Sequence, residues 1–197
     1  MDTQTLLALT GFAMAASWTP GPNNMMLAAS GATFGWRATV PHAMGVALGF
    51  PLMIFLIALG LGEIFQRSAA LRTGLAWGGF AVILYLGWRI AMAGSAKTGA
   101  RTRPLNFFEA AAFQWINPKG WVMAVAAAAT YASGGAPLRE AGVLAAVFLA
   151  VSLPGAQGWT LFGVGIGRML GTGVRLRAFN VIMGLLLASS ALLLVLD

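Results

Sequence analysis

The sequence has 197 residues, of which 59% are apolar and only 9% are charged, whereas roughly a quarter of a soluble domain is charged. Twelve basic and five acidic side chains are too few to cover a water-soluble fold of this length, so the composition predicts a membrane protein. The chain has no cysteine and one histidine, which excludes disulfides, thiolate chemistry and a multi-histidine metal site within one chain. The net charge of +7 does not predict nucleic-acid binding, because the cations lie between apolar runs rather than in one solvated patch.

Six apolar segments are long enough to cross a bilayer as helices, which takes about 20 residues. They cover residues 4–30, 39–62, 70–94, 108–133, 141–166 and 178–196. The remaining residues leave no room for a soluble domain, so we expect a single transmembrane domain over 1–197. Asp2 is the only early charge, and this argues against a signal peptide, which has a basic start.

Basic residues predict the orientation of these segments. One side of the membrane would carry eight of them and the other side three, namely Arg67, Arg72 and Arg139. The eight are Arg37, Arg89, Lys97, Arg101, Arg103, Arg168, Arg175 and Arg177. Short loops rich in Lys and Arg stay in the cytoplasm. We therefore predict a cytoplasmic loop at 95–107 and both termini on the periplasmic or extracellular side of a bacterial inner membrane.

Prolines fall at matching places in the two halves of the chain. Thr19-Pro20 breaks the first segment and Asn117-Pro118 breaks the fourth, while Pro51 and Pro154 lie inside the second and fifth. Interrupted helices at corresponding positions of two repeats indicate the central site of a transporter. Helix kinks that serve only packing are the alternative.

The halves, residues 1–94 and 108–197, hold three segments each and would therefore insert with opposite orientations. The predicted fold is an all-α membrane protein with six transmembrane helices as two inverted three-helix repeats. Helices 1 and 4 are expected to be interrupted at the membrane midplane.

The first break reads Gly21-Pro22-Asn23-Asn24, and proline both stops a helix and suits the first position of the next one. Each restarted helix has unpaired N–H groups that carry a partial positive charge. Lys119 adds a full charge beside the second start at Pro118. These features predict a centre that receives an anion, with a carboxylate as its natural small ligand.

Four amides are candidates for binding the polar groups of a ligand: Asn23, Asn24, Gln114 and Gln157. The alternative for these amides is hydrogen bonding between helices. Lys119 has an alternative too. It only snorkels to the surface if the fourth span begins near residue 118 and residues 105–117 lie in the membrane interface.

Two titratable residues are candidates for proton coupling, His42 at the start of the second span and Glu109 at the start of the fourth. The alternatives are a packed or interfacial histidine and a carboxylate paired with an arginine of the basic loop. No acidic residue lies mid-span, so a carboxylate proton relay is not visible. Gly45 and Gly49, like Gly163 and Gly167, allow close helix packing, which permits a homodimer without requiring one.

Several motifs together resemble the LysE/RhtB family of amino-acid exporters over nearly the whole chain. They are Gly21-Pro22-Asn23, Gly35-Trp36-Arg37-Ala38, Leu84-Tyr85-Leu86-Gly87-Trp88-Arg89, Asn117-Pro118-Lys119-Gly120-Trp121, Arg177-Ala178-Phe179-Asn180 and Met183-Gly184-Leu185. The Gly-Pro and Asn-Pro-Lys motifs are the specific part of this resemblance.

The resemblance implies a bacterial inner-membrane secondary transporter, without a cofactor, that exports amino acids or close relatives by proton-driven antiport. It marks Gly21, Pro22, Asn23, Asn117, Pro118 and Lys119 as motif residues. Family members often have an acidic residue where this chain has Asn23, so the resemblance disfavours a cationic substrate such as lysine. At the outer end of the fourth span, family members often have a Pro-Gln-Phe-like sequence, and this chain has residues 131–135 there instead.

We therefore expect alternating access, in which the two halves rock about a midplane site and Lys119 is the principal charge. A channel or a non-transporting scaffold is the main alternative. An intramembrane enzyme is less well supported, because it needs a nucleophile–base pair or metal ligands at one depth. We expect neither a catalytic site nor a bound metal.

Overall fold

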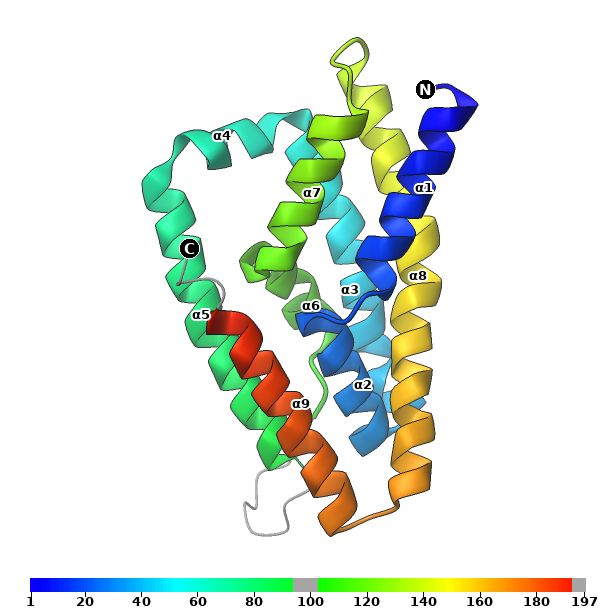
Figure 1. Ribbon diagram of the computed structural model, residues 1–197, viewed down its shortest axis with the longest axis vertical. Coiled ribbons are helices and arrows are strands. Elements are labelled where there is room, and N and C mark those ends of the chain that lie inside the picture. The colour runs from blue at the N-terminus through cyan, green and yellow to red at the C-terminus, as the bar shows by residue number, and fades with distance from the viewer. Residues whose placement is uncertain (94–102, 193–197) are drawn as a thin grey trace.

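The computed structural model describes residues 1–93 and 103–192, and every regular element among them is helical (Figure 1). The all-helical prediction is confirmed for these residues, and most of the predicted loop 95–107 lies outside them. The elements in chain order are α1 (Thr3–Trp18), α2 (Pro22–Phe34), α3 (Trp36–Leu56), the π-helical turn η1 (Ile57–Leu61), α4 (Gly62–Arg67), α5 (Ala69–Met92), α6 (Phe107–Phe113), the 3-10 turn η2 (Gln114–Ile116), α7 (Pro118–Tyr131), α8 (Pro137–Leu170) and α9 (Val174–Leu192).

Within residues 1–93 and 103–192, four helical stretches are long and apolar enough to cross a membrane, so the chain is a multi-pass membrane protein. They are Trp36–Arg67, Ala69–Met92, Pro137–Leu170 and Val174–Leu192, and they match the second, third, fifth and sixth predicted segments. The first and fourth segments are each divided, into α1 with α2 and into α6 with α7. A helix of 13 residues such as α2 is about 20 Å long, too short to cross about 30 Å of hydrocarbon alone.

The other internal prolines do not divide their helices. Helix α3 continues through Pro41 and Pro51, and α8 continues through Pro154. Neighbouring helices and local adjustments satisfy the carbonyl that a proline leaves free in a membrane helix. The match between Pro51 and Pro154 is therefore a match of position without a break.

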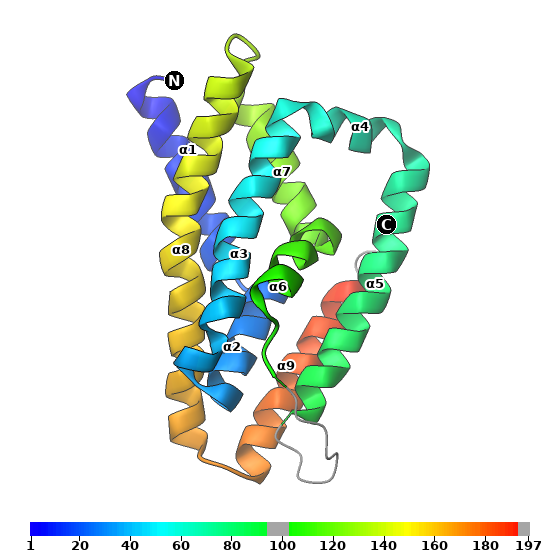
Figure 2. The same cartoon turned by 180° about the vertical axis from the view of Figure 1, so that it is seen from behind.

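The most extensive helix contacts join the two halves of the chain. Helix α8 packs along α3 and α2, while α5 packs along α9 (Figures 1 and 2). Glycines allow these close approaches, since Gly163 faces the backbone of Ala28, and Gly87 and Gly184 face each other's backbone. The same role is seen at Gly45, Gly49 and Gly167. The packing role predicted for the paired glycines is confirmed, and the two halves interleave.

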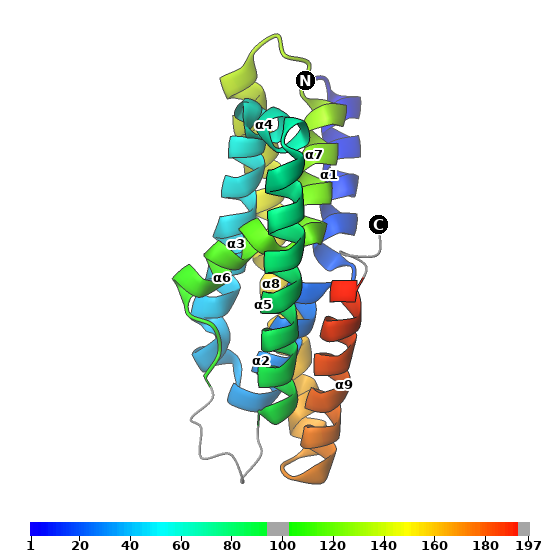
Figure 3. The same cartoon turned by 90° about the vertical axis from the view of Figure 1, so that its left-hand side faces the viewer.

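Helices α5 and α9 form a pair that lies beside the other long helices. We call helices α1, α2, α3, α6, α7 and α8 the central bundle. Helix α4 crosses one end of the molecule and connects α3 to this α5–α9 pair (Figure 2), and Figure 3 shows α4 nearly end-on above α5. The turn before α4 contains Gly60 at φ 120° and ψ −10°, a conformation that glycine adopts without strain. Helix α5 then begins after Ser68, whose Oγ accepts a hydrogen bond from the Leu71 N–H at 3.2 Å.

The two ends of the molecule carry the members of the two predicted basic sets that lie within the described residues; Lys97 and Arg101 lie outside them. The α2–α3 corner, the end of α5 and the α8–α9 connection lie together at the end far from the N-terminus (Figure 2). Helix α4 and the α7–α8 connection lie at the N-terminal end. The connections therefore group at two opposite ends of the molecule, as the predicted division of basic residues requires. Which end faces the cytoplasm stays a prediction.

Candidate functional site

The first helix break lies between Trp18 and Pro22. Thr19 is extended (ψ 146°), and α2 begins at Pro22 with no side chain capping its first turn. The Asn24 side chain supplies hydrogen bonds to backbone carbonyls at the C-terminal end of α1. Its Nδ2 donates to the carbonyl oxygens of Ser17 at 2.9 Å and Thr19 at 2.8 Å. The break that the prolines predict is present.

The second break is at Asn117, which is also extended (φ −83°, ψ 111°). It follows the turn η2, and α7 begins at Pro118, again with no capping side chain. Helices α2 and α7 run away from the middle of the molecule in opposite directions (Figure 1). Two helix N-termini, each with unpaired N–H groups, therefore face the same central region.

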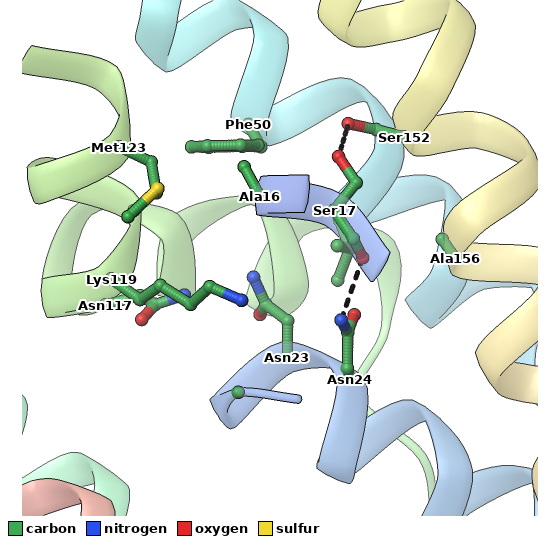
Figure 4. A pocket seen from close by; sticks show the side chains of 13 residues that line it. Ala16, Ser17, Asn23, Asn24, Phe50, Asn117, Lys119, Met123, Ser152 and Ala156 are labelled. Carbon is green, nitrogen blue, oxygen red and sulfur yellow. Dashed lines mark hydrogen bonds between the residues drawn. The ribbon is translucent and has the colours of Figure 1, made fainter. Parts of the chain in front are cut away.

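A small cavity lies between these two helix starts, and we call it the break cavity (Figure 4). Its volume is about 40 Å³, room for about three water molecules. The lining residues come from five helices and from the two breaks: Ala16, Ser17, Gly21, Asn23, Asn24, Val46, Phe50, Asn117, Lys119, Gly120, Met123, Ser152 and Ala156. None of these lining residues is acidic, so the cavity offers a positive charge, helix N-termini, amides and hydroxyls.

Lys119 lies in this cavity and binds the opposite break. Its Nζ donates to Thr19 Oγ1 at 2.7 Å and to the Thr19 carbonyl at 3.0 Å. Figure 4 shows the ammonium group beside Asn23. A Cβ on Gly21 would lie 2.8 Å from Lys119 Cδ, so glycine leaves room for the lysine. The half-buried side chain points inward, which disfavours the alternative of a snorkelling lysine.

Asn23 and Gln114 hold the two breaks together through a reciprocal amide pair. Asn23 Nδ2 donates to Gln114 Oε1 at 2.8 Å, and Gln114 Nε2 donates to Asn23 Oδ1 at 3.3 Å. Gln114 is fully buried and also donates to the Ala110 carbonyl at 2.8 Å. Gln114 therefore fixes the position of Asn23 without lining the cavity itself.

Pro22 and Pro118 start the two helices but do not line the break cavity. Three further predicted residues lie away from the cavity. Gln157 accepts a hydrogen bond from Trp36 Nε1 at 2.8 Å near the α2–α3 corner. His42 is buried beside Ser30, with 3.4 Å between Nδ1 and Oγ. Glu109 pairs with Arg103.

The Arg103–Glu109 contact is bidentate, with N–O distances of 2.7 and 2.6 Å. This carboxylate raises the pKa of Arg103. Glu109 also accepts from the backbone N–H of Asn106 at 2.8 Å and so completes a capping box at the start of α6. The pairing matches the simpler interpretation of Glu109.

Sequence reasoning missed the hydroxyl groups of the cavity. Ser17 and Ser152 lie 3.3 Å apart between their Oγ atoms and join α1 to α8 (Figure 4). Ser17 stands just before the Thr19-Pro20 break, and Ser152 stands two residues before Pro154. A serine two or three positions before a proline in a membrane segment is the sequence feature that could have predicted both residues.

A multi-pass helical chain with a polar cavity between two interrupted helices has the architecture of a membrane transport protein. The chain belongs to the family of LysE type translocators, whose model matches residues 14–197. It is similar to the cysteine/O-acetylserine efflux proteins of Escherichia coli strain K12 and of Escherichia coli O157:H7. In both cases 32% of 133 residues are identical, over 66% of this chain and 67% of the relative. No solved structure matches the chain.

Proposed function

We propose that this protein exports an amino acid, or a closely related small metabolite with a carboxylate, across the bacterial inner membrane. The observation that carries the proposal is the meeting of two uncapped helix N-termini and Lys119 at one cavity. A carboxylate is stabilised by both helix starts and by the ammonium group. The relatives named for cysteine and O-acetylserine efflux support this class of substrate.

The cavity chemistry favours amino acids with neutral side chains. None of the described residues that line the break cavity is acidic, so a cationic side chain would enter without a counter-charge from them. The substrate's own ammonium group has acceptors in the carbonyl of Thr19 and in the hydroxyls of Ser17 and Ser152. Lys119 exchanges the Thr19 carbonyl for the substrate carboxylate, because an ionised acceptor binds the ammonium group more strongly than a neutral one.

Export proceeds by alternating access within a single domain of six spans arranged as two inverted repeats. The break cavity holds only a few waters and must widen to admit an amino acid. The two halves interleave through α8 and through the α5–α9 pair, which argues against halves that rock as separate bodies. The α5–α9 pair moves against the central bundle instead, since Gly60 and η1 offer a flexible connection.

The proposal also covers the driving force of transport, the orientation of the termini and the assembly of the protein. The proton gradient drives transport, with His42 and Glu109 as the titratable groups on the side of the basic loop. Both termini face the periplasm. A homodimer remains compatible with the apolar outer faces of the helices, and neither a cofactor nor a nucleic acid takes part.

Efflux from vesicles tests the proposal. Purified protein in proteoliposomes is loaded with labelled O-acetylserine, cysteine or lysine, and a pH gradient is imposed. We expect saturable efflux of the two neutral amino acids that depends on the gradient, and little efflux of lysine. Absence of efflux for every amino acid contradicts the proposal. A flux that neither saturates nor responds to the gradient supports a channel.

A further inference from the structure

A second cavity lies where the α5–α9 pair meets the central bundle. It is separate from the break cavity, and its volume is about 40 Å³. Helices α2, α3 and α5 and residues 103–105 line it, and we call it the arginine cavity. Its polar lining residues are Ser30, Thr33, His42, Arg89 and Arg103.

His42 gives this cavity an unsatisfied hydrogen-bonding group. The side chain is 1% exposed, and its Nδ1 lies 3.4 Å from Ser30 Oγ. Its Nε2 has no hydrogen-bond partner in the part of the chain that the structure describes. A buried polar atom without a partner destabilises a fold unless a water or a ligand completes it. His42 therefore adds to the lining of the arginine cavity a polar side chain that has one unpartnered atom.

The charge around this cavity is positive. Arg89 belongs to α5, and its Nη2 donates to the Arg103 carbonyl at 3.2 Å. Glu109 neutralises Arg103 through the bidentate pair, and no carboxylate is among the lining residues. Two guanidinium groups against one carboxylate leave one net positive charge among these residues. Ser30 and Thr33 contribute hydroxyl groups to the lining of the same cavity.

The same helix lines both cavities. Asn23 lines the break cavity, and Ser30 lines the arginine cavity seven positions further along α2, which is about 10 Å of helix. The Asn23–Gln114 amide pair stands at the level of the break. Because α2 runs from the break toward the end of the molecule far from the N-terminus (Figure 1), the arginine cavity lies nearer to that end than the break cavity does.

We propose that the arginine cavity is a second carboxylate site, in which the exported substrate binds before it reaches the helix breaks. This proposal depends on the proposed function for its substrate. Arg89 attracts the carboxylate, Ser30 and His42 supply hydrogen bonds, and both walls belong to elements that move apart when the α5–α9 pair swings. Arg103 is on the side that the basic residues predict to be cytoplasmic. Positive charge in the arginine cavity raises the local concentration of anions.

Cysteine labelling tests the charge preference without any transport measurement, because the chain has no cysteine of its own. Ser30→Cys and Ala29→Cys place a thiol in the arginine cavity. Each purified variant is reacted with a sulfonate-bearing and with a trimethylammonium-bearing methanethiosulfonate. Each rate is divided by that reagent's rate with a small free thiol. We expect the anionic reagent to be favoured about tenfold, as in other positively charged clefts.

Arg89→Gln in the same background should bring the ratio close to one. The matched control is Arg37→Gln, which removes an arginine at the same end of the molecule that does not line this cavity. O-Acetylserine and acetate should slow the labelling of Ser30→Cys. Equal rates for the two reagents, an unchanged ratio in Arg89→Gln, or thiols that neither reagent reaches would overturn the proposal.

Vesicle efflux separates this proposal from the proposed function. Normal efflux without an anion preference in the arginine cavity refutes the second site alone. Anion preference without efflux of any amino acid refutes the export function and its use of this cavity, while the anion site stands. With both properties present, Arg89→Gln should raise the KM for O-acetylserine efflux more than it lowers the maximal rate.

Discussion

Lys119 and Thr19 are 100 positions apart in the sequence, yet the Lys119 ammonium group donates to both the hydroxyl and the carbonyl of Thr19. This contact joins the start of α7 to the end of α1. A cation near a helix C-terminus is stabilised by the carbonyls there, and the same cation lines the break cavity. Lys119 therefore has a structural partner in this conformation and a position from which it can reach a ligand.

Replacing Lys119 with Met should abolish most export. The variant keeps an unbranched side chain of similar length but removes the charge, and a hydrogen bond to a charged group contributes about 1.5 to 3 kcal/mol. We expect efflux of labelled O-acetylserine from vesicles to fall at least about tenfold. Arg139→Gln, a loss of charge at the far end, should keep normal efflux. Normal efflux by Lys119→Met would show that Lys119 does not take part in substrate binding.

Gly21→Ala should impair export through the position of Lys119. The added Cβ would lie 2.8 Å from Cδ and 3.2 Å from Nζ of the lysine, so the ammonium group must shift. We expect efflux to fall by about threefold to tenfold, equivalent to about 1 kcal/mol. Gly11→Ala on α1 is the matched control, because a Cβ there meets no atom within 4 Å. Equal efflux by the two variants would show that the lysine's exact position is unimportant.

The amide pair between Asn23 and Gln114 should show measurable coupling. Asn23→Ala leaves the buried Gln114 amide without this partner, which costs about 1 to 3 kcal/mol, and Gln114→Ala leaves the half-buried Asn23 amide without its partner. We expect the double variant to lose less unfolding free energy than the two single losses together, by about 0.5 to 1.5 kcal/mol. Denaturant unfolding in detergent micelles measures all three variants. Additive losses would mean that the two amides act independently.

Local chemistry explains which parts of the site were predictable. Pro20 and Pro22 flank a glycine, and Asn117 before Pro118 suits a helix start, so both breaks could be predicted from local residues. Pro41, Pro51 and Pro154 stand in neither of these patterns, and their helices continue. The glycine spacing predicted close packing at Gly163 because such an approach depends on the size of one residue. An interior position for Lys119 followed from the cost of a lone charge in hydrocarbon.

The remaining features depend on contacts between distant segments. The partner of Lys119 and the Ser17–Ser152 pair are set by how α1, α7 and α8 meet, which no single segment encodes. Gln157 binds Trp36 because Gly35, at φ 80°, turns the chain sharply between α2 and α3. The pairing of α5 with α9 likewise joins helices that the repeat pattern had assigned to separate halves.

Gly163→Ala should destabilise the central bundle at the α2–α8 contact. The added Cβ would collide with the backbone of Ala28, and a backbone cannot move aside as a flexible side chain can. Overpacking of this kind costs about 1 to 3 kcal/mol. Gly165→Ala, two residues later on α8, meets no atom within 4 Å and should be neutral or stabilising. Thermal unfolding in one detergent compares them, and equal midpoints would contradict the close α2–α8 approach.

Gly60→Ala should slow transport while it leaves substrate recognition intact. Gly60 has a φ of 120°, and forcing an alanine into such a conformation costs about 1 to 3 kcal/mol. The strain changes the path from α3 into α4 and so the freedom of the α5–α9 pair, but it does not touch the break cavity. We expect the maximal rate of O-acetylserine efflux to fall several-fold, with a KM within about twofold of the wild-type value. Gly74→Ala on α5, where a Cβ meets no atom within 4 Å, is the control and should transport normally. A rise in KM with an unchanged maximal rate would show that Gly60 affects the binding site, and that the α5–α9 pair does not move about this turn.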